Sequence, residues 1–486
     1  MDAETIVEVR PALTRYLRQF DGCFGRVTTR QHMDTYVLGQ LSPLLRKSVE
    51  PVADWAGVPP RTLQEFLSLF RWDESAMRDR LQQSVAAHHA HPQSVGIVDE
   101  TSFVKKGQKT ACVQRQHCGA VGKTENCVVS VHLGYATPDF HTLLDGELYL
   151  PEETWHEDRV RCREAGIPDE GVYRPKWQIA LGQVHRALNN GIRFAWLAFD
   201  EGYGGKPPFL RELDGLGQNY VGEVPANFRI WTREPAVLYR EHRPGRGPGQ
   251  PREEPRLKRK NPRTVEVRNV VTYSPGVRET PWETYHVKDG SKGPMVWRAK
   301  RTRVWLPDEN GLPGRPYHLL VTQNVLNPEE VKYFISNAPE GTWVETLLLV
   351  AFSRWKIERL FETSKTELGL DHFEVRRFLS VQRHLILSCV SHLFLAEFCL
   401  NRRGEKPGLD GGTGADGGGG TGACLGASGP LFAEVGRSDL RTASAHATPQ
   451  RSCEAGSSQE DPATPSRPWP ETGQPTQVFL EHFLAL

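Results

Sequence analysis

The chain has 486 residues, of which 60 are Lys or Arg and 59 are Asp or Glu, and 38% are hydrophobic. This length is enough for two or three domains with a sizeable core, and the near-zero net charge excludes a uniformly basic nucleic-acid-binding protein. The nine cysteines are widely spaced, with no CxxC pair or Cys/His cluster that would indicate zinc. This spacing is typical of a reducing compartment, so we expect a cytoplasmic protein.

Residues 1–90 are predicted to form a helical domain. The segment 49–70 has helical periodicity that is interrupted by Gly57 and by the pair Pro59-Pro60, which predicts two helices joined by a turn. Such a pair is found both in helix-turn-helix readers of DNA and in ordinary helical hairpins. Taken alone, this segment favours the hairpin.

Residues 91–224 show alternating strands and helices and are predicted to be the first part of an α/β core. A helix is expected at 177–191, where Gly191 ends the helical pattern. Because the strand-like runs are apolar throughout, both faces of the sheet are expected to be covered. The predicted strands are 94–99, 126–136, 140–151, 194–200 and 219–224.

Residues 225–340 interrupt this core with a segment rich in Pro, Gly and Arg. Strand-like pieces at 266–273 and 295–306 predict a β-rich insertion. Residues 240–263 hold nine Lys and Arg against three Glu. Such a run either contacts backbone phosphate or is a solvated loop.

Residues 341–403 are predicted to be helices that close the core. The apolar stretch 385–400 is too short for an ordinary membrane span, so we expect a buried helix and no membrane. Residues 404–486 begin with a Gly-rich run and continue rich in Ser, Thr, Ala and Pro, which predicts a disordered low-complexity tail. An out-of-frame 3′ end of a GC-rich gene would give the same composition.

Two aspartates are expected at the ends of buried strands. Asp99 closes the run 94–99, and Asp200 closes the run 194–200. Ligands of open α/β sheets bind at such strand ends, although Asp is also a common turn residue. The same position on two apolar strands favours a site over two unrelated turns.

A third acid lies on a late helix, predicted at 353–368. At about 100° per residue, Arg354, Glu358 and Lys365 share one stripe, which borders the apolar face of that helix. Cations on both sides would keep Glu358 ionised. The alternative is an exposed Arg–Glu pair one turn apart, and Glu362 is the main rival as third acid.

Together these acids suit metal-dependent cleavage of phosphodiesters. Such cleavage needs an activated water and stabilised charge on the attacking and leaving oxygens, which two divalent ions supply. Few carboxylates suffice for Mg²⁺, because it keeps several waters. We predict that Asp99 bridges two ions and that Asp200 and Glu358 hold one each. Lys365 and Arg354 would orient Glu358 or contact DNA phosphate.

Several blocks of the sequence resemble the DDE transposases of bacterial insertion sequences, in the branch with a β-strand insertion before the last catalytic Glu. The Tyr-Arg-Glu-Lys signature of that branch maps onto Arg354, Glu358 and Lys365, with Ala351 in place of the Tyr. The blocks appear in the expected order. They are VDETSFVKKG (98–107), VQRQHCGAVGKTENC (113–127), FDEGYGG (199–205), SRWKIERLFETSKTELGLDHFEVR (353–376) and Arg383-His384.

The resemblance implies a ribonuclease H-like core with a mixed sheet, a helical DNA-binding domain at 1–90, and catalysis with two Mg²⁺ or Mn²⁺ ions. It also implies binding of terminal inverted repeats, nicking at the ends of the element and joining of the freed 3′-hydroxyl to target DNA. Members of the branch act as homodimers in a synaptic complex.

The resemblance further implies that a Trp of the insertion stacks on a flipped base. The best matches are Trp297 and Trp305, and the cations interleaved with them suit phosphates. The alternative is a pair of core Trp residues on a sheet with a solvated basic face. The interleaved cations are Arg298, Lys300, Arg301 and Arg303.

Lys105 and Lys106 follow Asp99 in a predicted hairpin turn. They are further candidates for phosphate contacts, although a charged turn is the commoner meaning of such a pair. His117, His132 and His384 show no metal-ligand spacing, so we expect structural roles for them.

Two alternatives to an active transposase stay open at this stage. A catalytically decayed, DNA-binding remnant of an insertion element would agree with Ala351 and with the composition of 404–486. A glycosidase would use paired acids without metal. The basic insertion and the lack of an aromatic sugar-binding pattern argue against the glycosidase.

Overall fold

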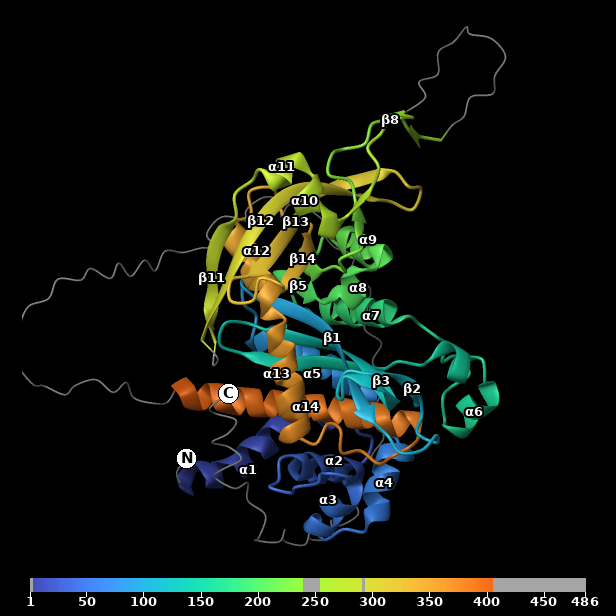
Figure 1. Cartoon of the computed structure of the whole chain (residues 1–486). Coiled ribbons are helices and arrows are strands. Elements are labelled where there is room, and N and C mark those ends of the chain that lie inside the picture. Colours follow the sequence, from blue (N-terminus) through green and yellow to red (C-terminus); the bar gives the residue numbers. More distant parts are fainter. Residues whose placement is uncertain (1–2, 239–253, 291–292, 405–486) are drawn as a thin grey trace, which may run out of the picture. The chain divides into compact units, whose positions relative to one another are not determined.

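The structure is a computed structural model that describes residues 3–238, 254–290 and 293–404. The described residues form a mixed α/β fold built on one large sheet (Figure 1). The tail predicted at 404–486, apart from Gly404, and most of the basic run predicted at 240–263 lie outside these residues.

The centre of the sheet has the strand order β4-β3-β1-β5-β6. Strand β3 pairs antiparallel with both β1 and β4, whereas β5 and β6 run parallel to β1. A short strand, β2, pairs with the beginning of β3. These strands are β1 Val95–Val104, β2 Gln114–Cys118, β3 Lys123–Ala136, β4 His141–Leu148, β5 Trp196–Phe199 and β6 Tyr220–Glu223.

Strands of the segment 225–340 extend this same sheet. They form an antiparallel series in which β14 pairs with β6 of the core, so the hydrogen-bonded ladder is continuous. The long strands are β11 Glu283–Gly290, β12 Gly293–Pro307, β13 Pro313–Asn324 and β14 Val331–Ser336. Four shorter strands lie outside the large sheet and form two two-stranded sheets, β7 Arg229–Ile230 with β10 Val265–Glu266 and β8 Val237–Leu238 with β9 Arg256–Leu257.

The strand predicted at 266–273 is wrong. After Glu266 the chain forms the 3-10 helix η3, Val267–Asn269, and then α10, Val270–Tyr273. Val267 and Val270 are the buried positions of this stretch, and a spacing of three is helical and not strand-like. Richness in β-branched residues therefore misled the prediction.

Helices of the first 90 residues are present as predicted. The turn expected near Gly57 is confirmed, because α3 ends there with a left-handed φ of 66° and α4 begins at Pro60. These helices are α1 Ala3–Leu17, η1 Arg18–Cys23, α2 Val27–Gln40, α3 Val49–Ala56, α4 Pro60–Ser68 and α5 Glu74–His88.

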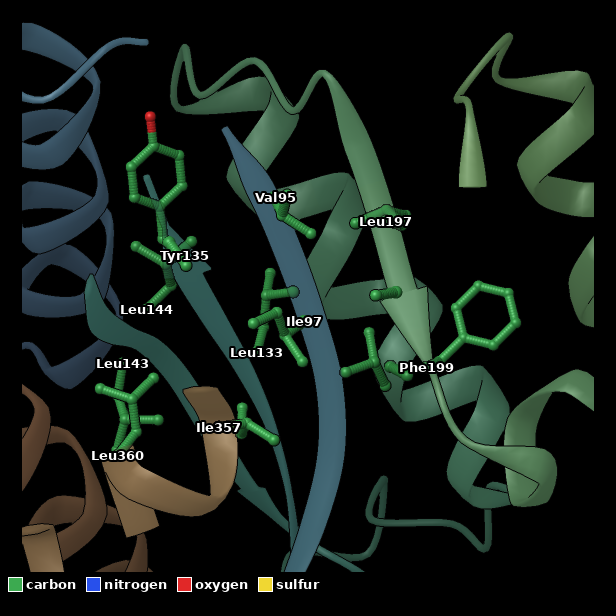
Figure 2. Packing of buried hydrophobic residues seen from close by; sticks show 14 of the residues in the cluster. Val95, Ile97, Leu133, Tyr135, Leu143, Leu144, Leu197, Phe199, Ile357 and Leu360 are labelled. Atoms are coloured by element: carbon green, nitrogen blue, oxygen red, sulfur yellow. The ribbon is translucent and has the colours of Figure 1, made fainter. Parts of the chain in front are cut away.

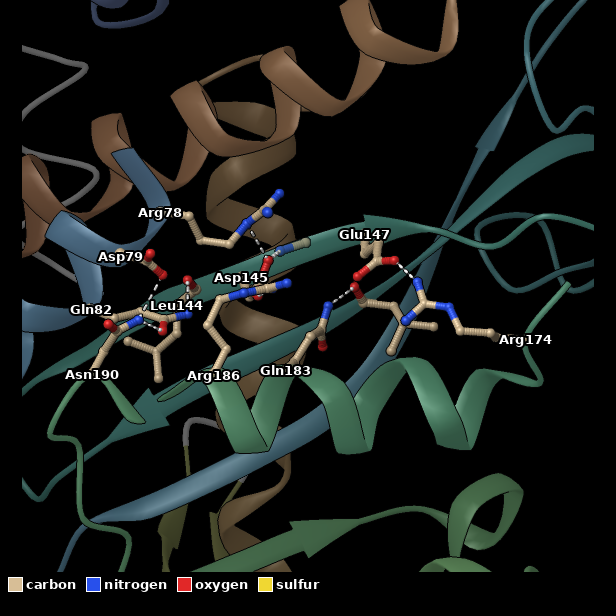
Figure 3. Close-up of polar contacts among 12 residues, drawn as sticks. Arg78, Asp79, Gln82, Leu144, Asp145, Glu147, Arg174, Gln183, Arg186 and Asn190 are labelled. Carbon is tan, nitrogen blue, oxygen red and sulfur yellow. Dashed lines mark hydrogen bonds and ion pairs between the residues drawn. The ribbon is translucent and has the colours of Figure 1, made fainter. Parts of the chain in front are cut away.

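Helices cover both faces of the central strands, which confirms that prediction. Figure 3 shows α7 on one side of β4 and α14 on the other, and Figure 2 shows α13 lying over β1 and β3. In β1 eight of ten residues are buried, and Glu100 and Val104 are the two that are not. The covering helices are α7 Lys176–Asn189, α9 Pro207–Gly215, α12 Val344–Ser353, α13 Trp355–Thr366 and α14 Phe378–Gly404.

The buried helix predicted at 385–400 is confirmed as part of α14. Among the described residues, the segment Phe378–Arg402 is the one helix long and apolar enough to cross a membrane, but 72% of its most apolar window is buried. The helix packs on β4 and on α2, α4 and α5. Short helices complete the fold: η2 Glu152–His156, α6 Arg159–Glu164, α8 Glu201–Gly204 and α11 Pro275–Arg278.

Candidate active site

The register of two parallel strands brings Asp99 and Asp200 together. The ladder between β1 and β5 runs from Val95 opposite Trp196 to Val98 opposite Phe199, so the next residues on the two strands are the two aspartates. Neighbouring strands are about 4.8 Å apart, which makes these residues direct neighbours. Asp200 leaves the sheet as the N-cap of α8, and its Oδ1 accepts a hydrogen bond from the Gly202 amide at 2.9 Å.

The prediction that Asp99 ends its strand is wrong. Strand β1 continues to Val104 because β3, its antiparallel partner on the other side, is long enough to pair with it throughout. Asp99 is instead the first residue of β1 beyond the end of β5. The acid therefore lies on backbone that is still paired with β3, at the edge where the parallel pairing with β5 stops.

Asp99 is buried, and both of its carboxylate oxygens have a protein partner. Oδ1 accepts a hydrogen bond from the Glu100 amide at 2.7 Å, and Oδ2 lies 2.9 Å from Nη1 of Arg354. Burial and the neighbouring charge of Asp200 raise the pKa of Asp99 to about 7, against the opposing effect of Arg354. Burial also raises the pKa of Asp200. Two desolvated acids side by side favour a bound cation.

Arg354 joins Glu358 to this pair. It lies at the junction where α12 ends and α13 begins, and its Nη2 is 3.3 Å from Oε1 of Glu358. The Glu358 side chain is 62% exposed, while Ile357 and Leu360 of the same helix point onto the sheet (Figure 2). The predicted stripe therefore borders the buried face at Arg354 and Glu358.

Lys365 does not contact these groups. Its Nζ donates to the carbonyl oxygen of Ser102 at 3.4 Å and lies 5.6 Å from the centre of the Phe103 ring. Burial lowers the pKa of Lys365. The structure thus brings four of the five predicted catalytic residues to one place, and Lys365 lies two turns of α13 away.

Glu362 and Glu100 each form an ion pair with a cation other than Arg354. Glu362, the rival third acid, pairs with Arg359 at 2.8 Å on the exposed side of α13. Glu100 alternates to the other face of β1, where its Oε1 lies 2.5 Å from Nζ of Lys176. Neither residue contacts Arg354.

Sequence reasoning missed Tyr203, which lies beneath the acids. The side chain is buried, and its hydroxyl donates to Oε2 of Glu100 at 3.5 Å. Burial and the charges of Glu100, Asp99 and Asp200 raise its pKa well above the ordinary value, so it stays a proton donor. Its position three residues after Asp200, inside the block FDEGYGG, was the available signal.

The donor set fits a divalent ion by its chemistry. Carboxylate oxygens are the ligands that Mg²⁺ and Mn²⁺ prefer, and Mg²⁺ needs only one or two of them because it keeps waters. Asp99 and Asp200 would hold such an ion, with Glu358 as the remaining acid. No group of three acids, His or Cys is already gathered at metal-binding distance in the part of the chain that is described. Arg354 takes up two of the three carboxylates.

The residues predicted to contact DNA divide into buried and exposed ones. Trp297 is buried, with its ring centre 4.7 Å from that of Phe352, so its position does not fit the predicted stacking on a base. Trp305 is half-buried, and its backbone pairs with that of Trp231 in both directions. Both placements agree with the alternative of core Trp residues.

The cations predicted to contact DNA include three that donate hydrogen bonds within the protein and three that are exposed. Nζ of the buried Lys300 donates to the carbonyl of Val277 at 2.8 Å, and burial lowers its pKa. Nζ of Lys105 donates to the carbonyl of Phe373 at 2.7 Å, and Arg298 donates to Oε1 of Gln323 at 2.7 Å. The exposed cations are Lys106, Arg301 and Arg303.

The predicted structural histidines include two that are fully buried. His132 hydrogen-bonds Ser130 at 2.7 Å, and burial lowers its pKa to about 4. His384 hydrogen-bonds Tyr36 at 2.8 Å and the carbonyl of Leu370 at 2.9 Å. The contacts of His384 join α14 to α2 and to the segment after α13, whereas the contact of His132 lies within β3. Full burial of both residues agrees with a structural role.

Three similarities to known proteins bear on this site. The family described as DDE superfamily endonuclease matches residues 19–294, a range that contains Asp99 and Asp200 and ends before Glu358. A curated relative, the "Probable transposase for insertion sequence element IS701" of Microchaete diplosiphon, is 28% identical over 247 residues. That alignment covers 49% of this chain and 60% of the relative, so the chain spans less than two thirds of the relative's length.

A solved structure of low similarity is the cryo-EM structure of the piggyBac transposase synaptic complex with hairpin DNA. It is 10% identical, covers 82% of this chain and 74% of that chain, and has a TM-score of 0.38, which is too low to support an argument about the fold. The family match, by contrast, covers more than half of the chain. The chain therefore belongs to the DDE superfamily endonuclease family.

Proposed function

We propose that the protein is a DNA transposase of a bacterial insertion sequence, in which Asp99, Asp200 and Glu358 hold two Mg²⁺ or Mn²⁺ ions. The observation that carries the proposal is the placement of Asp99 beside Asp200 by strand register, with Arg354 linking that pair to Glu358. Membership of the endonuclease family and the similarity to an insertion-sequence transposase support it.

The strand order supports a ribonuclease H-like core within this proposal. Three antiparallel strands are followed by α7 and then by two strands parallel to β1, with α9 between them. The branch with a β-strand insertion before the last acid is favoured by β11 to β14, which lie between Asp200 and Glu358 in the chain. Ala351, in the place of the signature Tyr, is the exception to that branch.

Each group at the site has a distinct role in this proposal. The ions, when bound, activate a water and stabilise charge on the attacking and leaving oxygens. Asp99 and Asp200 supply ligands from two adjacent strands, and the exposed Glu358 supplies one from the side open to solvent. Arg354 turns to the phosphate of bound DNA, for which a planar guanidinium is well suited.

DNA and a second copy of the chain are the proposed partners. The helices of residues 1–90 bind the terminal inverted repeats, and the exposed Lys106, Arg301 and Arg303 contact backbone phosphate. Two protomers assemble on two ends of the element, and the freed 3′-hydroxyl is joined to target DNA. We place this activity in the cytoplasm.

Strand joining by the purified full chain tests the proposal. The substrate is DNA that ends in the terminal repeats of the element, mixed with a target plasmid and Mg²⁺. We expect joined products from the wild type and a loss of about a thousandfold or more in Asp200→Asn. Glu201→Gln is the matched control, because Glu201 is the neighbouring acid and is exposed. Joining by Asp200→Asn at the wild-type rate, or activity that survives EDTA, would contradict the proposal.

A decayed, DNA-binding remnant is the second candidate function. Ala351 favours it, since the side chain is buried in α12 and offers no polar group to DNA. This candidate predicts salt-sensitive binding of the terminal repeats without any joined or nicked product.

A further inference from the structure

One guanidinium occupies two of the carboxylates that the proposed metal site needs. Nη1 of Arg354 lies 2.9 Å from Asp99 Oδ2, and Nη2 lies 3.3 Å from Glu358 Oε1. The other oxygen of Asp99 already accepts a hydrogen bond from the Glu100 amide. Arg354 thus bridges an acid of β1 and an acid of α13, which are the two elements that a metal ion would have to join.

The two aspartates require a positive charge beside them. Asp99 is buried, and the strand register places Asp200 beside it, so two carboxylates share one desolvated place that needs a compensating cation. Among the described residues, Arg354 is the cation in contact with Asp99, whereas Lys176 contacts Glu100 on the other face of β1. The guanidinium therefore neutralises the Asp99 carboxylate in this structure, as a divalent ion would in a metal-bound site.

A metal ion and Arg354 cannot both hold Asp99 at full strength. Two cations that share one carboxylate oxygen repel each other, and this repulsion is strong where water is excluded. The backbone of Arg354 lies at the junction of α12 and α13, beside the largely exposed Glu358. Its side chain is 23% exposed, so a phosphate that arrives from solvent has access to it.

We infer that Arg354 is a built-in counter-ion that competes with the divalent metal for Asp99 and Glu358, and that it yields to the metal when a DNA phosphate becomes its partner. This inference rests on the proposed function. Competition by Arg354 makes the metal affinity of the free protein low and that of the DNA-bound protein higher. The nuclease is therefore inactive until it binds DNA. Linkage requires that the removal of Arg354 strengthen metal binding in the absence of DNA.

Binding of Mn²⁺ to the full-length protein without DNA tests the inference. Free Mn²⁺ is followed by electron paramagnetic resonance for the wild type, Arg354→Met, Arg359→Met and Asp99→Asn. We expect Arg354→Met to bind Mn²⁺ about tenfold more tightly than the wild type, within the usual range of coupling between two ligands. Arg359→Met removes the same charge from within α13, where Arg359 pairs with Glu362, and should change the affinity less than about twofold. Asp99→Asn should abolish the tight site.

The outcomes separate this inference from the proposed function. If the wild type binds Mn²⁺ through Asp99 but Arg354→Met binds it equally or more weakly, Arg354 is an anchor of the site and the inference is wrong. If no variant binds Mn²⁺ in an Asp99-dependent way, the proposed function itself fails. Should Arg354→Met not fold, Arg354→Lys serves instead. The shorter Lys lacks the planar fork that matches the two carboxylates and holds them less firmly, so we expect a smaller gain of about threefold, and equal or weaker binding overturns the inference.

Discussion

At the scale of single residues, environment decides what each acid can do. Asp99 and Glu100 are neighbours in the chain, yet one lies beside Asp200 and Arg354 and the other pairs with Lys176 on the opposite face of β1. The alternation of side chains along a strand could be predicted from the sequence. The bridge from Arg354 to Asp99 could not, because it joins residues 255 positions apart.

The stability of the protein should depend on pH through Asp99. Its folded pKa of about 7 lies above the ordinary value of 3.8, so the fold favours the protonated form. The stability that protonated Asp99 contributes to the fold is fully present below about pH 4 and is lost as the pH rises through 7. In EDTA, the melting temperature of Asp99→Asn should therefore gain on that of the wild type by several degrees across this window. Other titrating groups affect both proteins equally. A difference in melting temperature that does not change with pH would therefore refute the raised pKa of Asp99.

At the scale of elements, close approaches of backbone fix the strand ends that carry the acids. Helix α8 follows Asp200 directly, and a Cβ added at Gly204 would lie 1.9 Å from the carbonyl oxygen of Glu223 in β6. Only the absence of a side chain lets α8 lie against β6. Gly204 lies in the block FDEGYGG, but no local pattern identifies the strand that it touches.

Gly204→Ala should be strongly destabilising for this reason. The new methyl group meets backbone and not a flexible side chain, so we expect a loss of about 2–3 kcal/mol or more. Gly215→Ala, at the end of α9, is the control, because a Cβ there meets no atom within 4 Å and Ala favours helix. Urea denaturation of both variants checks this, and equal stability would contradict the packing described for α8.

At the scale of the whole molecule, Asp145 joins three elements that are distant in the sequence. The residue is fully buried in β4, and its carboxylate lies 2.9 Å from Nε of Arg78 in α5 and 2.5 Å from Nη1 of Arg186 in α7 (Figure 3). The ion pairs link α5, one of the N-terminal helices, to β4 and to α7. Sequence patterns predicted β4, α7 and a helical domain that includes α5, but not the partners of Asp145, since both arginines also suit exposed helix faces.

Asp145→Asn should destabilise the whole fold. It leaves two arginines without their shared counter-charge, and loss of one partner of a buried pair costs about 3–5 kcal/mol. Glu340→Gln removes one partner of the exposed pair with Arg303 and should change stability by less than about 0.5 kcal/mol. Chemical denaturation of the two variants measures the difference. An effect of Asp145→Asn as small as that of Glu340→Gln would show that the network is not structural.

The central elements of the molecule could be predicted from the sequence, whereas the continuation of the sheet into residues 225–340 could not. Continuous apolar strands and helical periodicity predicted the central elements, because both signals are local. The pairing of β14 with β6, which continues the sheet into residues 225–340, depends on strands more than 100 positions apart in the chain. No local pattern encodes such a register.

The most direct test of the catalytic acids compares Glu358 with its rival on the same helix. Nicking of a plasmid that carries the terminal repeats is measured with Mg²⁺ and with EDTA, for the wild type, Glu358→Gln and Glu362→Gln. We predict Mg²⁺-dependent nicking by the wild type and by Glu362→Gln, and a loss of about a thousandfold or more in Glu358→Gln. Wild-type nicking by Glu358→Gln, or a loss confined to Glu362→Gln, would contradict the assignment of Asp99, Asp200 and Glu358 as the metal-binding acids.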